Sequence, residues 1–216
     1  MEVKIVVSWV FAFLILTLSC VKTKEAEHFE KIQDQWYVNL RDTVLNQKIE
    51  EKYIRYVFQG DSTYSIEWGN QQFHKKSTSK LDVLGSGVPG VLDSNEETIL
   101  LSQSCGTSCT TFIILPFEKN QNLKVFDFAV AYDLKNKLIA YVPSSDSFIR
   151  IENFKSGRTK DITEDNVCPA ASKNECIESA RFESNNFVLK WQGKEWQPNK
   201  PNLLEKVIPI DLNLIE

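Results

Sequence analysis

The chain has 216 residues, with 25 Lys and Arg against 29 Asp and Glu, so its formal net charge is −4 at pH 7. This length is enough for one domain with a substantial hydrophobic core. Its basic residues form no stripe, whereas nucleic-acid binding depends on clustered Lys and Arg that neutralise phosphates. We therefore expect no nucleic-acid partner.

The N-terminal segment 1–19 has the features of a secretory signal peptide. Lys4 precedes an apolar run from Ile5 to Leu18, which only Ser8 and Thr17 interrupt. A helix of this length spans ~21 Å, less than the ~30 Å hydrocarbon core of a bilayer. The run is therefore typical of a signal peptide rather than a transmembrane helix, and we expect residues 1–19 to form a short helix that is removed on export.

The apolar run ends in Leu-Thr-Leu-Ser-Cys, with the small residue Ser19 directly before Cys20. This ending resembles the lipobox of bacterial lipoproteins, in the relaxed form familiar from bacteroidete-like and spirochaete-like members. It has Thr17 where leucine is common. The resemblance covers only the segment from Met1 to Cys20. It implies that Cys20 is lipidated, becomes the mature N-terminus and holds the protein in the membrane of the cell envelope by a lipid anchor. The alternative is an ordinary cleaved signal peptide beside an incidental cysteine.

Residues 20–34 form the predicted lipid attachment and tether. The stretch is polar, and Glu25–Gln33 is a helical candidate within it. A lipid on Cys20 would also explain why the chain has an odd number of cysteines, five, since four then remain to pair.

Residues 35–216 are predicted to form a single antiparallel β domain. Short apolar or alternating runs follow one another, separated by connectors with turn chemistry such as Gly69-Asn70 and Ser184-Asn185-Asn186. The one helical candidate in this part is Pro169–Cys176. The fold class is therefore all-β: an antiparallel meander arranged as a β-sandwich, as a curled sheet, or as a partial β-propeller with blade-sized units of about 40–50 residues. The predicted strands lie at 53–58, 62–68, 97–104, 110–117, 123–133, 137–143, 147–153, 158–163, 177–184, 186–192 and 204–212.

Two cysteine pairs are predicted to form local disulfides. If Gly106-Thr107-Ser108 is a three-residue hairpin loop, Cys105 and Cys109 are directly opposed, with Cα atoms ~4.5–5.5 Å apart. The common three-residue loop has its left-handed residue last, whereas glycine is first here. Cys168 and Cys176 bracket a short excursion that a second bridge would close. Four cysteines allow three pairings, of which we favour the two local ones.

Metal and redox chemistry at these cysteines is the less favoured interpretation. Zinc sites need spacings like Cys-x-x-Cys, and no metal site or cofactor is predicted. The Cys105–Cys109 spacing resembles that of some copper-chaperone motifs, with His74 as a third ligand, but those motifs belong to βαβ folds. A redox pair would need a helix N-terminus to activate the thiol, and a β-rich run follows Cys109 instead.

No catalytic residue is assigned from the sequence. Gly-Ser-Gly-Val-Pro-Gly at 85–90 matches a dinucleotide fingerprint literally, but no long helix begins there, so we interpret it as a loop. Four acidic residues are candidates for a carboxylate pair in an exported hydrolase, although sequence spacing cannot place two of them at a working separation. These candidates are Asp127, Asp161, Glu164 and Asp165.

Trp191 and Trp196 form the candidate binding surface. They flank Gly193 in Trp-Gln-Gly-Lys-Glu-Trp and precede prolines. We expect a non-enzymatic envelope lipoprotein that serves as a binding or structural module for a protein or glycan partner. The alternatives are an exported hydrolase with a carboxylate site and copper or redox handling through Cys105 and Cys109.

Overall fold

The computed structural model of this chain describes residues 44–49, 51–58, 63–82, 87–106, 108–195 and 202–211. The predicted signal peptide, Cys20, the tether 20–34 and Trp196 lie outside the described residues.

The described residues form four antiparallel sheets, and almost every strand pairs with its neighbour in the sequence. The first sheet contains β1 (Val44–Ile49), β2 (Lys52–Phe58), β3 (Thr63–Gly69), β4 (His74–Lys76) and the short β5 (Leu81–Asp82), which pairs with β3. The second contains β6 (Gly90–Asn95), β7 (Thr98–Gly106), β8 (Cys109–Pro116) and β9 (Lys124–Phe126). The third contains β10 (Ala129–Asp133), β11 (Leu138–Tyr141), β12 (Ile149–Asn153) and β13 (Thr159–Ile162). A single 3-10 turn, η1 (Lys173–Cys176), precedes the fourth, which contains β14 (Ile177–Glu183), β15 (Asn186–Gln192) and β16 (Leu203–Pro209).

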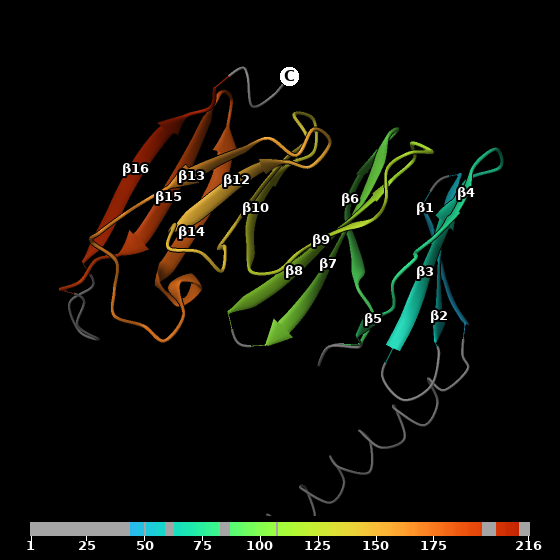
Figure 1. Cartoon of the computed structure of the whole chain (residues 1–216), viewed down its shortest axis with the longest axis horizontal. Helices are drawn as coiled ribbons and strands as arrows, with labels where there is room; N and C mark the ends of the chain where they lie inside the picture. The colour runs from blue at the N-terminus through green and yellow to red at the C-terminus, as the bar shows by residue number, and fades with distance from the viewer. Residues whose placement is uncertain are drawn as a thin grey trace, which may run out of the picture.

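The four sheets are stacked in chain order, as Figure 1 shows from the blue β1 to the red β16. Each adjacent pair of sheets encloses one hydrophobic cluster, and the described residues form three such clusters. Successive meander sheets packed face to face are the arrangement of neighbouring β-propeller blades. The all-β antiparallel prediction is confirmed, and its propeller-like version describes the stack better than a two-sheet sandwich.

The side-chain pattern of each strand follows its place in the stack. In the second sheet, Ile99 and Leu101 face the first sheet, whereas Leu100 between them faces the third. Successive side chains of a strand point to opposite faces, so a sheet buried on both sides needs an unbroken apolar run. In β2 of the first sheet, by contrast, Ile54 is fully buried and its neighbour Arg55 is exposed.

The outer faces of the two end sheets carry ion pairs. On the first sheet, Glu67 lies 3.6 Å from Arg55 and 3.2 Å from Lys76. On the fourth sheet, Lys190 lies 2.8 Å from Glu205. These faces are therefore polar where the inner faces are apolar.

One predicted strand is two strands in the structure. The run 123–133 contains β9 of the second sheet and β10 of the third, joined by a turn at Asp127 and Phe128. Phe126 and Ala129 flank this turn and are both buried between the two sheets, so the chain crosses from one sheet to the next within a short turn. The helical prediction for Pro169–Cys176 is met only by the single turn η1.

Candidate functional site

The cysteines pair locally, as predicted, but the geometry of the first bridge differs from the expectation. The Cα atoms of Cys105 and Cys109 are 5.1 Å apart, and those of Cys168 and Cys176 are 5.6 Å apart. Cys109 is opposed by Gly106 rather than by Cys105, because the register shifts between Ser104 and Gly106. Gly106 takes φ = +131° and Ser108 takes φ = +55°, so glycine does not supply the only left-handed position of this hairpin end.

Trp191 is a core residue, which corrects the expected binding surface. Its side chain is 4 % exposed and packs edge-to-face on Phe148, with ring centroids 6.0 Å apart. Its indole Nε1 donates a hydrogen bond of 2.7 Å to the main-chain oxygen of Asn166. Burial with its polar atom satisfied makes this ring part of the contact between the third and fourth sheets rather than a ligand platform.

Of the four candidate carboxylates, only Asp127 lines the groove where the second and third sheets meet. Asp161 accepts two hydrogen bonds from Arg150, at 2.6 and 2.8 Å, and these hold the pKa of its carboxyl below the usual value. Glu164 lies 3.3 Å from the ammonium of Lys206. Two of the candidates are thus engaged in ion pairs elsewhere on the surface.

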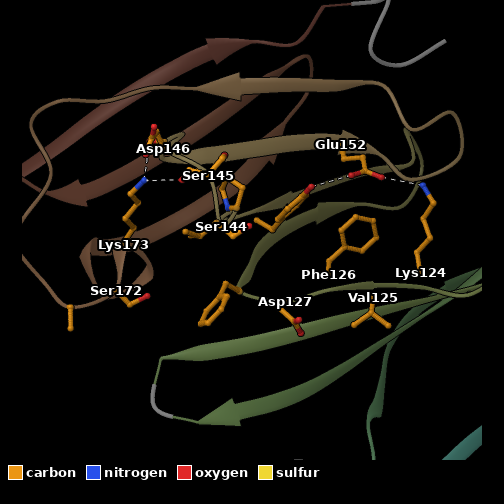
Figure 2. Close-up of a pocket in the computed structure, with 15 residues that line it drawn as sticks. Lys124, Val125, Phe126, Asp127, Ser144, Ser145, Asp146, Glu152, Ser172 and Lys173 are labelled. Atoms are coloured by element: carbon orange, nitrogen blue, oxygen red, sulfur yellow. Dashed lines mark hydrogen bonds and ion pairs between the residues drawn. The ribbon is translucent and has the colours of Figure 1, made fainter. Parts of the chain in front are cut away.

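The candidate site is a groove of about 790 Å³ where the second and third sheets meet (Figure 2). One side is formed by β9 and the turn that follows it. The other is formed by the end of β11, the segment after it, one residue of β12, and the start of η1 with the two residues before it. The groove is lined by Lys124, Val125, Phe126, Asp127, Phe128, Tyr141, Val142, Pro143, Ser144, Ser145, Asp146, Glu152, Ala171, Ser172 and Lys173.

A hydrogen-bonded trio occupies one end of this groove. Glu152 accepts from Lys124 at 3.1 Å with one carboxylate oxygen and from the Tyr141 hydroxyl at 3.1 Å with the other. Burial, and next the charge of Glu152, raise the pKa of the Tyr141 phenol above its usual value. Both oxygens of Glu152 therefore have partners within the protein, and Tyr141 remains a neutral hydrogen-bond donor.

The opposite end of the groove is built around Lys173, which Figure 2 shows beside Ser145 and Asp146. Its ammonium donates to the main-chain oxygens of Ser145, Asp146 and Ser147 at 3.2, 2.9 and 3.1 Å. An ammonium has three N–H donors, so these three contacts use all of them. Lys173 thereby ties the loop closed by Cys168 and Cys176 to the segment that follows β11, on the same side of the groove.

Phe128 is the unusual residue of the groove. Its backbone takes φ = +53°, a left-handed conformation that is a genuine outlier for a bulky side chain, and its carbonyl accepts a 3.1 Å hydrogen bond from the amide of Val142. The ring is 38 % exposed, and the neighbouring Val125 is 40 % exposed. Strain that holds an aromatic ring partly in solvent, at the edge of a groove, is the kind that accumulates at binding sites.

Sequence reasoning missed most of this groove. Asp127 was selected as a carboxylate, but Phe128, Glu152 and Lys173 carry no local motif. The turn at Asp127-Phe128 contains no Gly, Pro or Asn, and Lys173 contacts carbonyl groups rather than side chains. No signal in the sequence would have joined these residues.

Among the described residues, no group of three His, Cys, Asp or Glu side chains is placed to hold a metal ion. His74, considered above as a copper ligand, lies on the exposed face of the first sheet, stacked on Tyr53. Within the same residues, no helix combines the length and the apolar character that crossing a membrane requires.

No protein-family model matches this chain, and no curated protein sequence is significantly similar to it.

Proposed function

We propose that this protein is a lipid-anchored binding module of the cell envelope, without catalytic activity, and that the groove between the second and third sheets holds its ligand. The observation that carries the groove assignment is the exposed ring of Phe128, fixed in a left-handed backbone conformation at the edge of a cavity of about 790 Å³. Ligand sites are typically concave and combine apolar side chains with a few placed polar groups.

The envelope location is supported by the N-terminal segment 1–20 and by the cysteines. The lipobox-like ending at Cys20 implies the anchor. Two disulfides agree with an oxidising compartment, because thiols stay reduced in the cytosol of most organisms. The disulfide of Cys105 and Cys109 also leaves that pair without the free thiolates that copper or redox handling would need.

A hydrolase with a carboxylate site is the second candidate, because Asp127, Asp146 and Glu152 line one groove. Glu152 is the most enclosed of the three, and both of its oxygens already accept hydrogen bonds. A general acid or base must turn an oxygen toward the substrate, and the two oxygens of Glu152 are turned toward Lys124 and Tyr141 instead. The arrangement therefore supports binding better than acid–base catalysis.

The anchor is tested by palmitate labelling of cells that make the parent chain or Cys20→Ala. We expect label on the parent alone, and equal labelling of the two would refute the anchor.

The groove is tested by placing a photo-crosslinking amino acid in the full, anchored chain, at Val125 or at Val207. The two valines are 40 % and 56 % exposed, but only Val125 lines the groove, so Val207 on β16 is the matched control. Illumination of intact cells should give a discrete adduct at 125 that is missing at 207 and in a Phe128→Ala background. The same adducts at both positions, or none at either, would remove the groove as the binding site.

A further inference from the structure

We infer that the groove selects an extended peptide segment that carries lysine or arginine side chains. This inference rests on the proposed function and adds the chemical class of the ligand. It follows from three features of the groove: which of its charged groups are already paired within the protein, the apolar side chains beside them, and the strand that forms one wall.

The cationic groups of the groove are consumed within the protein. Lys124 pairs with Glu152 at 3.1 Å, and Lys173 donates to three main-chain oxygens. Among the lining residues these two are the only cations, so an anionic ligand would find no ammonium without a partner.

The carboxylates of the groove retain acceptor capacity. Asp127 accepts one hydrogen bond, from the Thr111 hydroxyl to its Oδ1 at 2.8 Å. Asp127 and Asp146 are both exposed. Lys173 donates to the main-chain oxygen of Asp146 and forms no ion pair with its carboxylate. An ionised carboxylate offers about four lone-pair positions. A neutral ligand that covered these groups would remove their hydration without replacing it, whereas an ammonium or guanidinium would compensate the charge.

The apolar part of the groove suits the stem of a basic side chain. Val125 and Phe128 are both partly exposed, and Phe128 directly follows Asp127 in the chain. Lys and Arg lay their methylene groups on apolar surface while the charged end stays with polar partners, and a cation over an aromatic face gains a further contribution. Phe128 and Asp127 both line the groove, so the two halves of such a site face one cavity.

The wall formed by β9 favours a peptide over a glycan. In the part of the chain that the structure describes, β9 is the last strand of the second sheet and pairs only with β8. Its three residues, Lys124–Phe126, all line the groove. An edge strand presents main-chain N–H and C=O groups that an incoming extended segment can pair with. A sugar cannot form such a ladder.

The test uses the full mature chain with its anchor, kept in detergent, and a fluorescein-labelled tetralysine peptide followed by fluorescence anisotropy. Comparison probes are the same peptide with acetylated side chains, which keeps its length and removes its charges, and a glucosamine tetramer, which carries amines on a sugar. We expect the tetralysine peptide to bind, its affinity to fall at least about tenfold on acetylation, and the glucosamine tetramer to bind more weakly.

The variants locate the binding. Asp127→Asn and Asp146→Asn should each weaken tetralysine binding about threefold to fivefold, the range of one partly exposed ion pair. Asp127→Asn keeps an oxygen that can accept from Thr111. Asp165→Asn makes the same charge change at an exposed residue outside the groove and should leave the affinity unchanged.

Three results would overturn the inference: equal affinity for the acetylated peptide, equal loss in Asp127→Asn and Asp165→Asn, or no binding of tetralysine at all. Tighter binding of the glucosamine tetramer would replace the peptide by an amino-sugar ligand. The proposed function has its own readout, because crosslinking at Val125 against Val207 reports use of the groove whatever the ligand is. An adduct at 125 together with failure of the tetralysine test would therefore reject only the ligand class.

Discussion

The side-chain amide of Asn174 donates a hydrogen bond of 2.6 Å to the main-chain oxygen of Ser108. Asn174 lies in the loop that Cys168 and Cys176 close, and Ser108 lies in the hairpin end that Cys105 and Cys109 close. This contact joins the two disulfide-closed loops. The loop of Asn174 precedes the fourth sheet, and the loop of Ser108 is a hairpin end of the second sheet. The loop that carries Ser172 and Lys173 is thus fixed on both sides, to Ser108 and to the carbonyl groups that Lys173 contacts.

Removal of this link should destabilise the protein modestly. Asn174 is 8 % exposed, and Asn174→Ala should lower the free energy of unfolding by about 1 kcal/mol, the net value of one hydrogen bond. Asn174→Asp should cost more, because a carboxylate facing the Ser108 oxygen has no donor. Urea unfolding measures both, with Asn120→Ala in an exposed turn as the control. Equal stability of Asn174→Ala and the parent would contradict the contact.

The two disulfides should differ in their effects on stability and on binding in the groove. From loop closure alone, replacing Cys105 and Cys109 by Ala costs about 2 kcal/mol, and replacing Cys168 and Cys176 costs about 2.6 kcal/mol. Only the second pair closes the loop that lines the groove, so tetralysine binding should fall in that double variant and persist in the first. Denaturant unfolding and anisotropy give the two quantities. Loss of binding in both variants would show that the loop is not the specific wall we describe.

The left-handed backbone at Phe128 should be detectable by comparing two small residues. Phe128→Ala and Phe128→Gly both remove the ring, but only Gly adopts φ = +53° without steric cost. The free energy of unfolding of Phe128→Gly should therefore be about 1 kcal/mol higher than that of Phe128→Ala. Both variants should lose the crosslink at Val125. If Phe128→Ala is the more stable of the two, the backbone does not hold the ring under strain.

Burial of Trp191 predicts a large cost of truncation. Trp191→Ala removes a side chain that is 4 % exposed and should lower the free energy of unfolding by about 3–5 kcal/mol. Leu203→Ala on β16, where the side chain is 50 % exposed, should change it by less than about 0.5 kcal/mol. Urea unfolding followed by far-UV circular dichroism separates these values. A small effect at Trp191 would restore the exposed-platform interpretation.

Two buried tyrosines should make the protein sensitive to high pH. Burial raises the pKa of the Tyr56 phenol above its usual value of 10.0, and it raises that of Tyr64 with added contributions from Tyr56 and Asp82. Above pH ~10 the unfolded chain loses these protons first and so binds fewer than the native state. The associated stability is therefore fully present below pH ~10 and declines as the pH rises further.

Urea unfolding between pH 8 and 12 measures this decline, and the Tyr56→Phe/Tyr64→Phe variant should show a shallower one. The same slope in parent and variant would assign the effect to other groups.

Much of the fold could be predicted because its contacts are local. Within each sheet almost every strand pairs with its neighbour along the chain, so short turns and alternating runs such as 53–58 and 186–192 are sufficient signals. Trp191 could also have been placed: it continues the alternation of Phe187 and Leu189, and all three side chains belong to one core cluster. The nearby Gly193 favours an exposed turn, a local signal that conflicts with this alternation.

The groove could not be predicted, because its parts meet only through the stacking of sheets. The run 123–133 is apolar enough for one continuous strand. The chain turns at Asp127 and Phe128 because Phe126 of the second sheet and Ala129 of the third are both buried between these two sheets. Lys173 finds main-chain oxygens of residues 145–147, which any sequence would provide. Contacts with main-chain oxygens do not depend on residue type, so the sequence gives no signal for them.

The stacking order has a consequence for how disturbances spread through the molecule. Each hydrophobic cluster is shared by adjacent sheets only, so cooperativity passes from sheet to sheet as it does between units of a repeat array. The first sheet, held by a single cluster, can open by fluctuation while the second and third stay packed on each other at the groove. Amide exchange should accordingly be fastest in β1 and slowest in β7, β8 and β11.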